Sequence, residues 1–314
     1  TQNAFVKMCR AFADPDPVSG ILRGERLEIL VTPDQVDVAT LRLREFAPTL
    51  YHQIPYGDIW LRDTGPIFTR DADGKRYVQR FDFNGWGGKY RLPHDRLVAG
   101  RVARVWKSLN PQGRIVKNPW IFEGGSVDVN GAGLGLTTKQ CLLNTNRNPR
   151  MSQEQIEAHL RESLGIERMF WLTHGLVNDH TDGHVDNIAR FIAPNVVICM
   201  EPYASDDPHR DVLHDILRKL KTFRVNGSQR LEIVTIPSPG RVEDPDGNVM
   251  PASYLNFYIG NRAVILPMFD SPYDDQAGHR IAACFPGRII VGVSAKHLLS
   301  GGGAFHCITQ QEPK

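Results

Sequence analysis

The stretch NIARFIAPNVVICME, residues 187–201, consists of two short apolar segments joined by a turn at Pro194-Asn195, and it predicts a β-hairpin. Three other stretches have the same form, and two of them turn at Asp-Gly or Asn-Gly, the strongest short-range hairpin signals. They are 66–83 with a turn at Asp73-Gly74, 126–143 with a turn at Asn130-Gly131, and 254–268 with a turn at Gly260-Asn261. Successive turns lie 57, 64 and 66 residues apart, so the sequence predicts a structural repeat.

Helical patterns lie between the hairpins. Residues 152–164 begin with Ser152 and Gln155, a capping-box pattern, and Gly165 follows as a stop signal. Helices are also predicted over 34–46, 95–109 and 208–223, and an apolar strand over 288–294. A repeat of about 60 residues then contains strand, strand, helix and strand, and five such units fill 314 residues. We therefore expect an α/β fold in which residues 1–314 form a single closed assembly instead of two independent domains.

The composition excludes several classes of protein. The chain is 41% hydrophobic and 23% charged, with 37 Lys and Arg against 35 Asp and Glu, so it has no basic surplus for nucleic-acid binding. Mean hydropathy is −0.31 and no apolar run has the length of a membrane helix, so no membrane partner is expected. The cysteines are odd in number, widely spaced and without a CxxC pair, which favours free thiols in a reducing compartment. Residues 1–10 lack a signal-peptide pattern and a starting Met, and a cytoplasmic location is expected.

Unusual polar residues recur with the period of the repeat. Asp63 precedes the first predicted hairpin, Glu123 the second, and His184 with Asp186 the third, while Cys307 lies near the C-terminus. The separations are 60 from 63 to 123, 61 from 123 to 184 and 123 from 184 to 307, the last about twice the others. Equivalent positions in a ring of repeats converge on its axis, so these residues are expected to meet at one central site. The fourth unit is expected to contribute a residue between 253 and 256.

Each of these residues also has a purely structural interpretation. Asp63 could cap a helix, and Glu123 could stabilise a turn. His184 and Asp186 could be a hydrogen-bonded structural pair, and Cys307 could be a core thiol, as most buried cysteines are. The shared period favours the functional interpretation over four independent coincidences.

Other chemistries have weaker support. His180 and His184 are four residues apart, a spacing that could hold zinc on a helix, but Gly183 lies between them and no metal is expected. The chain has no GxSxG motif, and the glycines at 301–303 are not followed by Lys-Ser or Lys-Thr. A serine hydrolase and a phosphate-binding loop are therefore not predicted, and no cofactor is expected.

A thiol, an imidazole and three carboxylates together suit a cationic substrate. Neighbouring carboxylates raise the pKa of a thiol, and a bound cation would reverse that effect. A guanidinium presents a planar set of N–H donors that carboxylates bind with two hydrogen bonds. Its carbon is a poor electrophile, which calls for a strong nucleophile such as a thiolate. The residue set therefore indicates attack on a guanidinium or an amidine.

At these residues the sequence resembles the agmatine deiminase family, which includes the bacterial type of peptidylarginine deiminase. The matching segments are WLRDTGP (60–66), NGWGGKY (84–90), EGGS (123–126), TDGHVDN (181–187), SYLNFYIGN (253–261) and GGGAFHCITQQ (301–311). No motif is matched in the first 50 residues. The resemblance implies a pentein fold, a five-bladed α/β propeller with pseudo-fivefold symmetry. It also implies hydrolysis of a guanidine to a urea and ammonia without a metal or cofactor.

The resemblance implies a role for each residue. Cys307 is the nucleophile and His184 the general acid/base. Asp63 and Asp186 hold the guanidinium nitrogens, and Glu123 supports His184. The further substrate-binding positions are Trp60, which walls the site, Asn256 and His180. The expected reaction converts agmatine to N-carbamoylputrescine and ammonia through a thiouronium on Cys307.

Alternatives stay open at this point. His180 stands where agmatine deiminases typically have an acidic residue that recognises the distal amine. Lys89 or Arg91 could instead receive the carboxylate of free arginine or peptidyl-arginine, or could be solvated surface residues. An amidinotransferase would pass the amidino group from Cys307 to an amine, and a non-catalytic binding protein is disfavoured because the reactive residues are all present. The chain could pair as a homodimer, and residues 237–251 could form either a lid or a surface connection.

Overall fold

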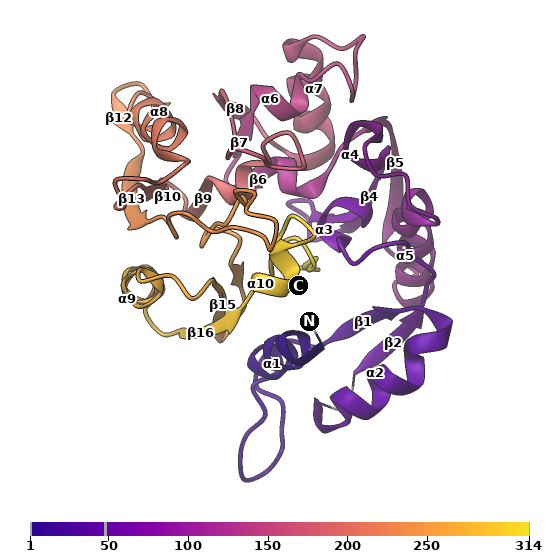
Figure 1. Ribbon diagram of the computed structural model, residues 1–314. Coiled ribbons are helices and arrows are strands. Elements are labelled where there is room, and N and C mark those ends of the chain that lie inside the picture. The colour runs from indigo at the N-terminus through magenta and orange to yellow at the C-terminus, as the bar shows by residue number, and fades with distance from the viewer. Residues whose placement is uncertain (1, 47–48, 314) are drawn as a thin grey trace.

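The computed structural model describes residues 2–46 and 49–313, and within them a unit of hairpin, helix and third strand occurs four times (Figure 1). In its first occurrence β3 (Ile67–Arg70) pairs antiparallel with β4 (Arg76–Asp82), and β5 (Arg114–Ile121) returns parallel to β4. Helix α5 (Asp95–Leu109) makes the crossover, the usual connection between parallel strands. The predicted hairpin at Asp73-Gly74 and the helix over 95–109 are confirmed.

The other three units have the same strand order. Their sheets are β6 (Val127–Val129), β7 (Leu134–Thr138) and β8 (Arg168–Leu172); β9 (Ala189–Ala193), β10 (Val196–Glu201) and β13 (Glu232–Pro237); and β14 (Tyr258–Ile259), β15 (Ala263–Met268) and β16 (Ile289–Ser294). The crossovers contain α6 (Lys139–Leu142) with α7 (Gln153–Leu164), then α8 (Arg210–Leu220), then α9 (Asp274–Cys284). The third also holds the small hairpin β11 (Arg224–Asn226) and β12 (Gln229–Arg230). The mixed α/β class and all four predicted hairpins are confirmed.

The N-terminal unit departs from the predicted pattern. β1 (Glu28–Val31) and β2 (Leu50–Gln53) form a parallel pair, which has no antiparallel neighbour within the described residues. Between them lie η1 (Pro33–Gln35), α2 (Val36–Leu43) and η2 (Arg44–Phe46), and α1 (Gln2–Ala13) comes first. A loop containing Pro15 and Pro17 precedes β1. The loop forms only an isolated antiparallel bridge between Pro15 and Leu22, since proline cannot donate to a longer strand ladder, and the expectation of a hairpin in every unit was wrong for this one.

Local sequence accounts for the helix ends. The Ser152 side chain accepts from the Gln155 backbone and the Gln155 side chain from the Ser152 backbone, so the capping box is confirmed. Helix α8 begins at Arg210 and not at 208 as predicted. Asp207 accepts the backbone N–H of His209 at 2.8 Å, an Asx turn that delays the helix by two residues.

Short irregular elements bring polar residues to the middle of the molecule. Asp63 lies in α3 (Leu61–Thr64), Glu123 precedes η3 (Gly124–Ser126), and His184 precedes η4 (Val185–Asn187). Each stands directly before the first strand of its unit, as does Asn256 before β14. The C-terminal segment that follows α10 (Lys296–Leu299) ends among the units (Figure 1). Four of the units therefore each supply at least one polar group to the same region.

The core is apolar and continuous over most of the chain. All residues of the inner strand β7 are buried, as are Ala263–Pro267 of the inner strand β15. The largest cluster of buried side chains extends from Met8 in α1 to Ile308 near the C-terminus. No helix in the described part of the chain has the length and apolar character needed to cross a membrane.

Candidate active site

Gly125 marks the point where the central side chains meet. A methyl group on its α-carbon would lie 2.6 Å from His184 Nδ1, 3.0 Å from Asp186 Oδ2 and 3.1 Å from Asp63 Oδ1. All four residues are buried. Groups from three units therefore surround one small space, which only a glycine at position 125 leaves open.

Asp63 is fixed by two hydrogen bonds. Trp86 Nε1 donates to Oδ2 at 2.9 Å, and the Gly125 backbone N–H donates to Oδ1 at 2.9 Å. Trp86 belongs to α4 (Gly85–Gly88) and has φ 51° and ψ 56°, a left-handed conformation that few non-glycine residues adopt. The glycines on both sides of Trp86 allow this tight turn, which directs the indole N–H at the carboxylate.

Glu123 and His184 form a buried pair. His184 Nε2 donates to Glu123 Oε2 at 3.0 Å. His184 Nδ1 lies 3.7 Å from Asp63 Oδ2 and has no hydrogen-bond partner among the described residues. Since Nε2 is occupied by Glu123, Nδ1 is the ring nitrogen that faces the central space and can exchange a proton there.

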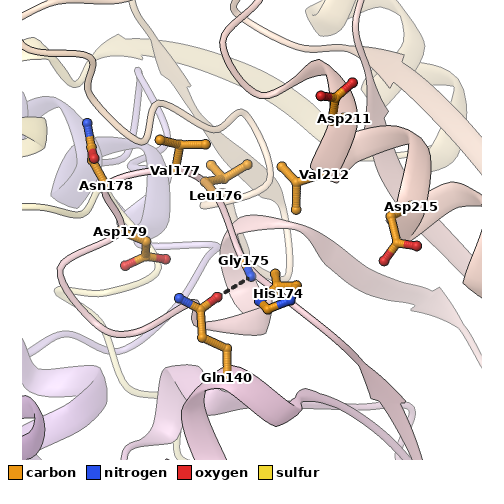
Figure 2. Close-up of a pocket in the computed structure, with 10 residues that line it drawn as sticks. All are labelled: Gln140, His174, Gly175, Leu176, Val177, Asn178, Asp179, Asp211, Val212 and Asp215. Carbon is orange, nitrogen blue, oxygen red and sulfur yellow. Dashed lines mark hydrogen bonds between the residues drawn. The ribbon is translucent and has the colours of Figure 1, made fainter.

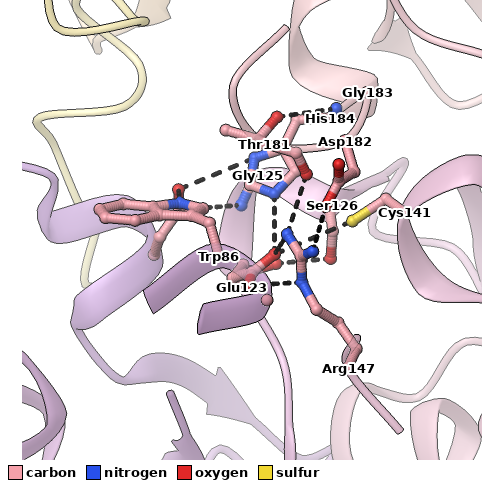
Figure 3. A network of polar contacts seen from close by, with 12 residues as sticks. Trp86, Glu123, Gly125, Ser126, Cys141, Arg147, Thr181, Asp182, Gly183 and His184 are labelled. Carbon is pink, nitrogen blue, oxygen red and sulfur yellow. Dashed lines mark hydrogen bonds and ion pairs between the residues drawn. The ribbon is translucent and has the colours of Figure 1, made fainter. Parts of the chain in front are cut away.

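Arg147 extends this pair into a network that the sequence did not predict (Figure 3). Its Nε and Nη2 donate to Glu123 Oε1 and Oε2 at 2.9 and 3.0 Å, a bidentate pair with both side chains fully buried. Arg147 Nη1 also donates to Asp182, which in turn accepts from Lys89 Nζ at 2.7 Å. Arg147 lies in the segment NTNRNPR (144–150), outside the repeat period; its only sequence signal is a cation in a polar turn before a helix.

Asn256 holds the segment that carries Cys307. Its Nδ2 donates to Cys307 Sγ at 3.0 Å, and its Oδ1 accepts the backbone N–H groups of Ala304 and His306 at 3.0 and 3.1 Å. Cys307 Sγ lies 3.7 Å from Asp186 Oδ2. The structure thus places Asn256, expected near the substrate, in direct contact with the thiol.

A second imidazole reaches Asp186. His306 Nδ1 donates to Asp186 Oδ2 at 2.6 Å, and both residues are buried. Asp186 Oδ1 has no hydrogen-bond partner among the described residues. His306 was part of a recognised motif but not of the predicted site.

Trp60 and His180 lie at the glycine segment beside the thiol. Trp60 is buried, and a methyl group on Gly303 would lie 2.9 Å from both the Trp60 ring and Cys307 Sγ. His180 is only half-buried; a methyl group on Gly302 would lie 2.9 Å from its ring. Trp60 is therefore adjacent to the thiol, whereas His180 is separated from it by the glycine segment.

A sequence profile of the Porphyromonas-type peptidyl-arginine deiminase family matches residues 1–313. The chain belongs to this family. The match includes the first 50 residues, in which no motif was recognised.

Similar proteins agree with the family. The agmatine deiminase of Stutzerimonas stutzeri is 35% identical over 330 residues, which cover 99% of this chain and 87% of the relative. The structure of an agmatine deiminase of Enterococcus faecalis matches with a TM-score of 0.86 and 30% identity, covering 100% of this chain and 87% of that one. The structure of a C. jejuni agmatine deiminase variant, in which a cysteine is replaced by serine and substrate is bound, matches with a TM-score of 0.86 and 25% identity. The match covers 99% of this chain and 87% of that one. The predicted family, the α/β fold of pentein-type deiminases and the enzyme class, a hydrolase of C–N bonds, are confirmed.

Burial opposes ionisation of the acidic groups in the deiminase site. It raises the pKa of Asp186 to about 7 and also raises the pKa of Asp63. Burial raises the pKa of the Cys307 thiol well above its usual value, and the charges of Asp186 and Asp63 add to this effect. The empty site therefore disfavours the thiolate, and a bound cation would promote it.

The charges around His184 have the opposite effect. Burial alone would lower the pKa of its imidazole, but Asp63, Cys141 and Glu123 together raise it well above its usual value. Burial likewise opposes the charge of Glu123, yet His184 and Arg147 hold the pKa of this carboxyl below its usual value. The groups around His184 therefore favour its imidazolium form.

One cluster in the deiminase resembles a metal site in its donor atoms. Glu123, Cys141 and His184 each offer one ligand atom, all within 4.8 Å of one another. Arg147 already bonds both oxygens of Glu123, and a divalent cation would have to lie against that guanidinium. The charge arrangement does not fit a metal ion, and no step is assigned to one.

A surface hollow lies apart from the site. It is lined by residues of the segment 174–179 and of α8, including His174, Asp211 and Asp215 (Figure 2). The predicted loop 237–251 lies against this segment, because Asn178 Nδ2 donates to the carbonyl of Val249 at 3.0 Å. None of the central residues at Gly125 lines the hollow.

Proposed function

We propose that this deiminase hydrolyses agmatine to N-carbamoylputrescine and ammonia. The observation that carries the proposal is the placement of two buried carboxylates, Asp63 and Asp186, around the space that also receives His184 Nδ1. Cys307 Sγ lies beside Asp186 at 3.7 Å. Carboxylates bind a guanidinium on its N–H edges, which leaves its carbon exposed to a thiolate. The relatives named as agmatine deiminases support the choice of agmatine among guanidines.

The first half of the reaction needs a thiolate and an acid. Binding of the guanidinium between Asp63 and Asp186 neutralises their charge and lowers the pKa of Cys307, so that the thiol gives its proton to solvent. The Cys307 thiolate attacks the guanidinium carbon and forms a C–S bond in a tetrahedral adduct. His184, protonated at Nδ1, gives that proton to the departing nitrogen, the C–N bond breaks, and ammonia leaves a thiouronium on Cys307.

The second half reverses these roles. Neutral His184 Nδ1 takes a proton from water, and the hydroxide attacks the same carbon. The C–S bond then breaks with its electron pair returning to sulfur, the hydroxyl proton of the adduct restores the Cys307 thiol, and the neutral ureido product leaves. Glu123 stays ionised because Arg147 bonds both its oxygens, and it holds the His184 ring in one orientation throughout. Trp60 covers the thiol side of the space.

The test is release of ammonia and ureido product from a panel of guanidines. Agmatine, free L-arginine, a peptide with C-terminal arginine and short guanidino acids are compared with wild type and Cys307→Ala. We expect agmatine to have the highest kcat/KM and the variant to be inactive. Turnover by Cys307→Ala would overturn the mechanism, and ammonia release that requires an added amine acceptor would indicate an amidinotransferase.

Deimination of free or peptidyl arginine is the second candidate. Lys89 is engaged with Asp182 and is a poor carboxylate receptor. Arg91 is exposed and lines a hollow together with Tyr90 and Arg96. The Tyr90 ring contacts the Trp86 ring, which connects this hollow to the site. If arginine substrates are preferred, Arg91→Ala raises their KM and leaves that of agmatine unchanged.

We also propose that the whole chain is one catalytic domain, a five-unit propeller with pseudo-fivefold symmetry around the site. Arg190 of the third unit supports this arrangement, because its Nε donates to Asp128 of the second unit at 2.6 Å. Its Nη1 donates to the carbonyls of Leu255 and Phe257, which border the fourth unit, at 3.0 and 3.1 Å. The parallel pair of β1 and β2 would be the fifth unit. Limited proteolysis that released a stable fragment would contradict a single domain.

Location and assembly remain proposals. All five cysteines are free thiols, which supports a reducing, cytoplasmic environment. The homodimer stays a prediction, which sedimentation of the purified chain tests.

A further inference from the structure

His306 makes a contact that the proposed reaction does not use. Its Nδ1 lies 2.6 Å from Asp186 Oδ2, a hydrogen bond slightly shorter than is usual between a ring N–H and a carboxylate. The residue is buried next to Cys307 in sequence, and its backbone N–H is fixed by Asn256 Oδ1 at 3.1 Å. Its carbonyl accepts from Arg62 Nε at 3.3 Å. Both the backbone and the ring of His306 are therefore held in place.

The two oxygens of Asp186 have different surroundings as a result of this contact. Oδ2 is taken by His306, whereas Oδ1 has no partner among the described residues. A buried carboxylate oxygen without a donor is costly in the empty protein, and a guanidinium N–H can satisfy it. The His306 bond fixes the rotation of the carboxylate and favours its ionised form.

His306 can act in this way only as a donor, and its surroundings keep it neutral. Burial lowers the pKa of its imidazole, and the positive charges of Arg190, Arg62 and His184 lower it further. The other charged groups near Asp186 are Asp63 and Asp179, which oppose its ionisation. A neutral ring carries one proton, and when Asp186 is ionised that proton lies on Nδ1 toward Asp186 Oδ2.

We propose that His306 is a positioning residue for substrate binding, which holds the carboxyl group of Asp186 turned so that Oδ1 accepts a guanidinium N–H. The inference rests on the proposed binding of a guanidinium by Asp186. It assigns His306 no contact with the reacting carbon and no proton transfer.

Two amide substitutions separate this role from simple packing. In His306→Asn the amide nitrogen occupies the place of Nδ1 and can still donate to Asp186. In His306→Gln the amide nitrogen occupies the place of Nε2 and cannot. Both variants keep a polar side chain, so a role in packing alone predicts similar effects from both. His306→Ala removes the donor without added bulk and replaces the Gln variant if that variant does not fold.

Steady-state kinetics on the best guanidine substrate give the first readout. A hydrogen bond to a charged group is worth about a 10- to 100-fold change in binding, so we expect KM to rise by about that factor in His306→Gln. kcat should change less, and His306→Asn should stay within about threefold of wild type. Equal losses in the Asn and Gln variants, or an unchanged KM in His306→Gln, would overturn the proposal.

Alkylation of Cys307 gives a second readout that needs no turnover. Chloroacetamidine is a cation that requires Asp186, whereas iodoacetamide is neutral. The ratio of their rates should fall at least tenfold in His306→Gln and persist in His306→Asn. This pattern in a protein that deiminates no tested guanidine would refute the proposed function and still support the role of His306. A ratio that is the same in wild type and His306→Gln would overturn it.

Discussion

At the scale of single residues, Arg147 supplies the charge that lets Glu123 stay ionised inside the protein. It bonds both oxygens of Glu123, which holds His184 Nε2. Arg147→Met removes this cation and leaves Oε1 of the buried Glu123 carboxylate without its donor. We expect a loss of about 3–5 kcal/mol in unfolding free energy. kcat should fall about 100-fold, because Glu123, the partner of the His184 ring, is no longer held in place. Urea unfolding and ammonia release measure the two effects.

A double variant tests whether the broken Arg147–Glu123 ion pair causes the loss of stability in Arg147→Met. Glu123→Gln in the Arg147→Met background leaves a neutral amide that needs no cation. We expect it to recover much of the lost stability but none of the activity, since the amide does not stabilise an imidazolium. A double variant no more stable than Arg147→Met would contradict the assigned pairing.

Asn256 acts on Cys307 through one atom and on the backbone through another. Asn256→Asp keeps an oxygen for the N–H groups of Ala304 and His306 but loses the N–H that donates to Sγ. Asn256 lowers the pKa of the thiol, so the substitution should raise it further. We expect alkylation by iodoacetamide at pH 8 to slow at least tenfold. Tm should fall as well, because Nδ2 also donates to Asn187 Oδ1 at 2.9 Å and the variant buries a carboxyl group there.

The matched control is Asn195→Asp, in the turn between β9 and β10. It should leave the alkylation rate unchanged. An unaltered pH profile of alkylation in Asn256→Asp would mean that the Nδ2 contact does not influence the thiol.

At the scale of elements, η3 matters because its backbone passes through the centre of the site. A methyl group at Gly125 would stand 2.6 Å from His184 Nδ1, in the space proposed for the guanidinium. We expect Gly125→Ala to lower kcat/KM at least 100-fold. Gly278→Ala in α9 is the control, because there a methyl group meets only Leu266 at 3.8 Å and alanine favours the helix. Steady-state kinetics of both variants test this prediction. Full activity in Gly125→Ala would mean that the guanidinium does not bind in this space.

Local signals predicted the elements that have strong local causes. The hairpin at Asp73-Gly74, the capping box at Ser152 and the helix α5 follow from adjacent residues. The start of α8 depends on an Asx turn at Asp207, which cannot be predicted from the spacing of apolar residues in the helix. The N-terminal unit has a proline-containing loop where the repeat predicted a hairpin.

The period also explains which site residues could be predicted. Asp63, Glu123 and His184 recur at the same place in successive units, so their convergence follows from the repeat. Arg147 comes from a crossover and has no equivalent position to reveal it. The contact of His306 with Asp186 joins residues 120 positions apart and depends on how the C-terminal segment enters the centre.

At the scale of the whole molecule, enclosing the site lowers the stability of the protein without substrate, because the fold buries a carboxyl group that would otherwise ionise in water. Burial raises the pKa of Asp186 from 3.8 to about 7. Between these values the folded protein keeps a proton that the unfolded chain has released, so the free energy of unfolding falls as pH rises through this window. A shift of about 3 pKa units corresponds to roughly 4 kcal/mol by pH 8.

Asp186→Asn removes this titration, and its amide oxygen can still accept from His306. We expect the variant to be inactive, to match wild type in stability near pH 4.5, and to exceed it by about 2–4 kcal/mol at pH 8. Asp63 and Cys307 are present in both proteins, so their contributions largely cancel in the difference. Urea unfolding at the two pH values measures it. A stability difference that does not grow with pH would show that Asp186 is not held at a cost, and that its charge is already balanced before substrate binds.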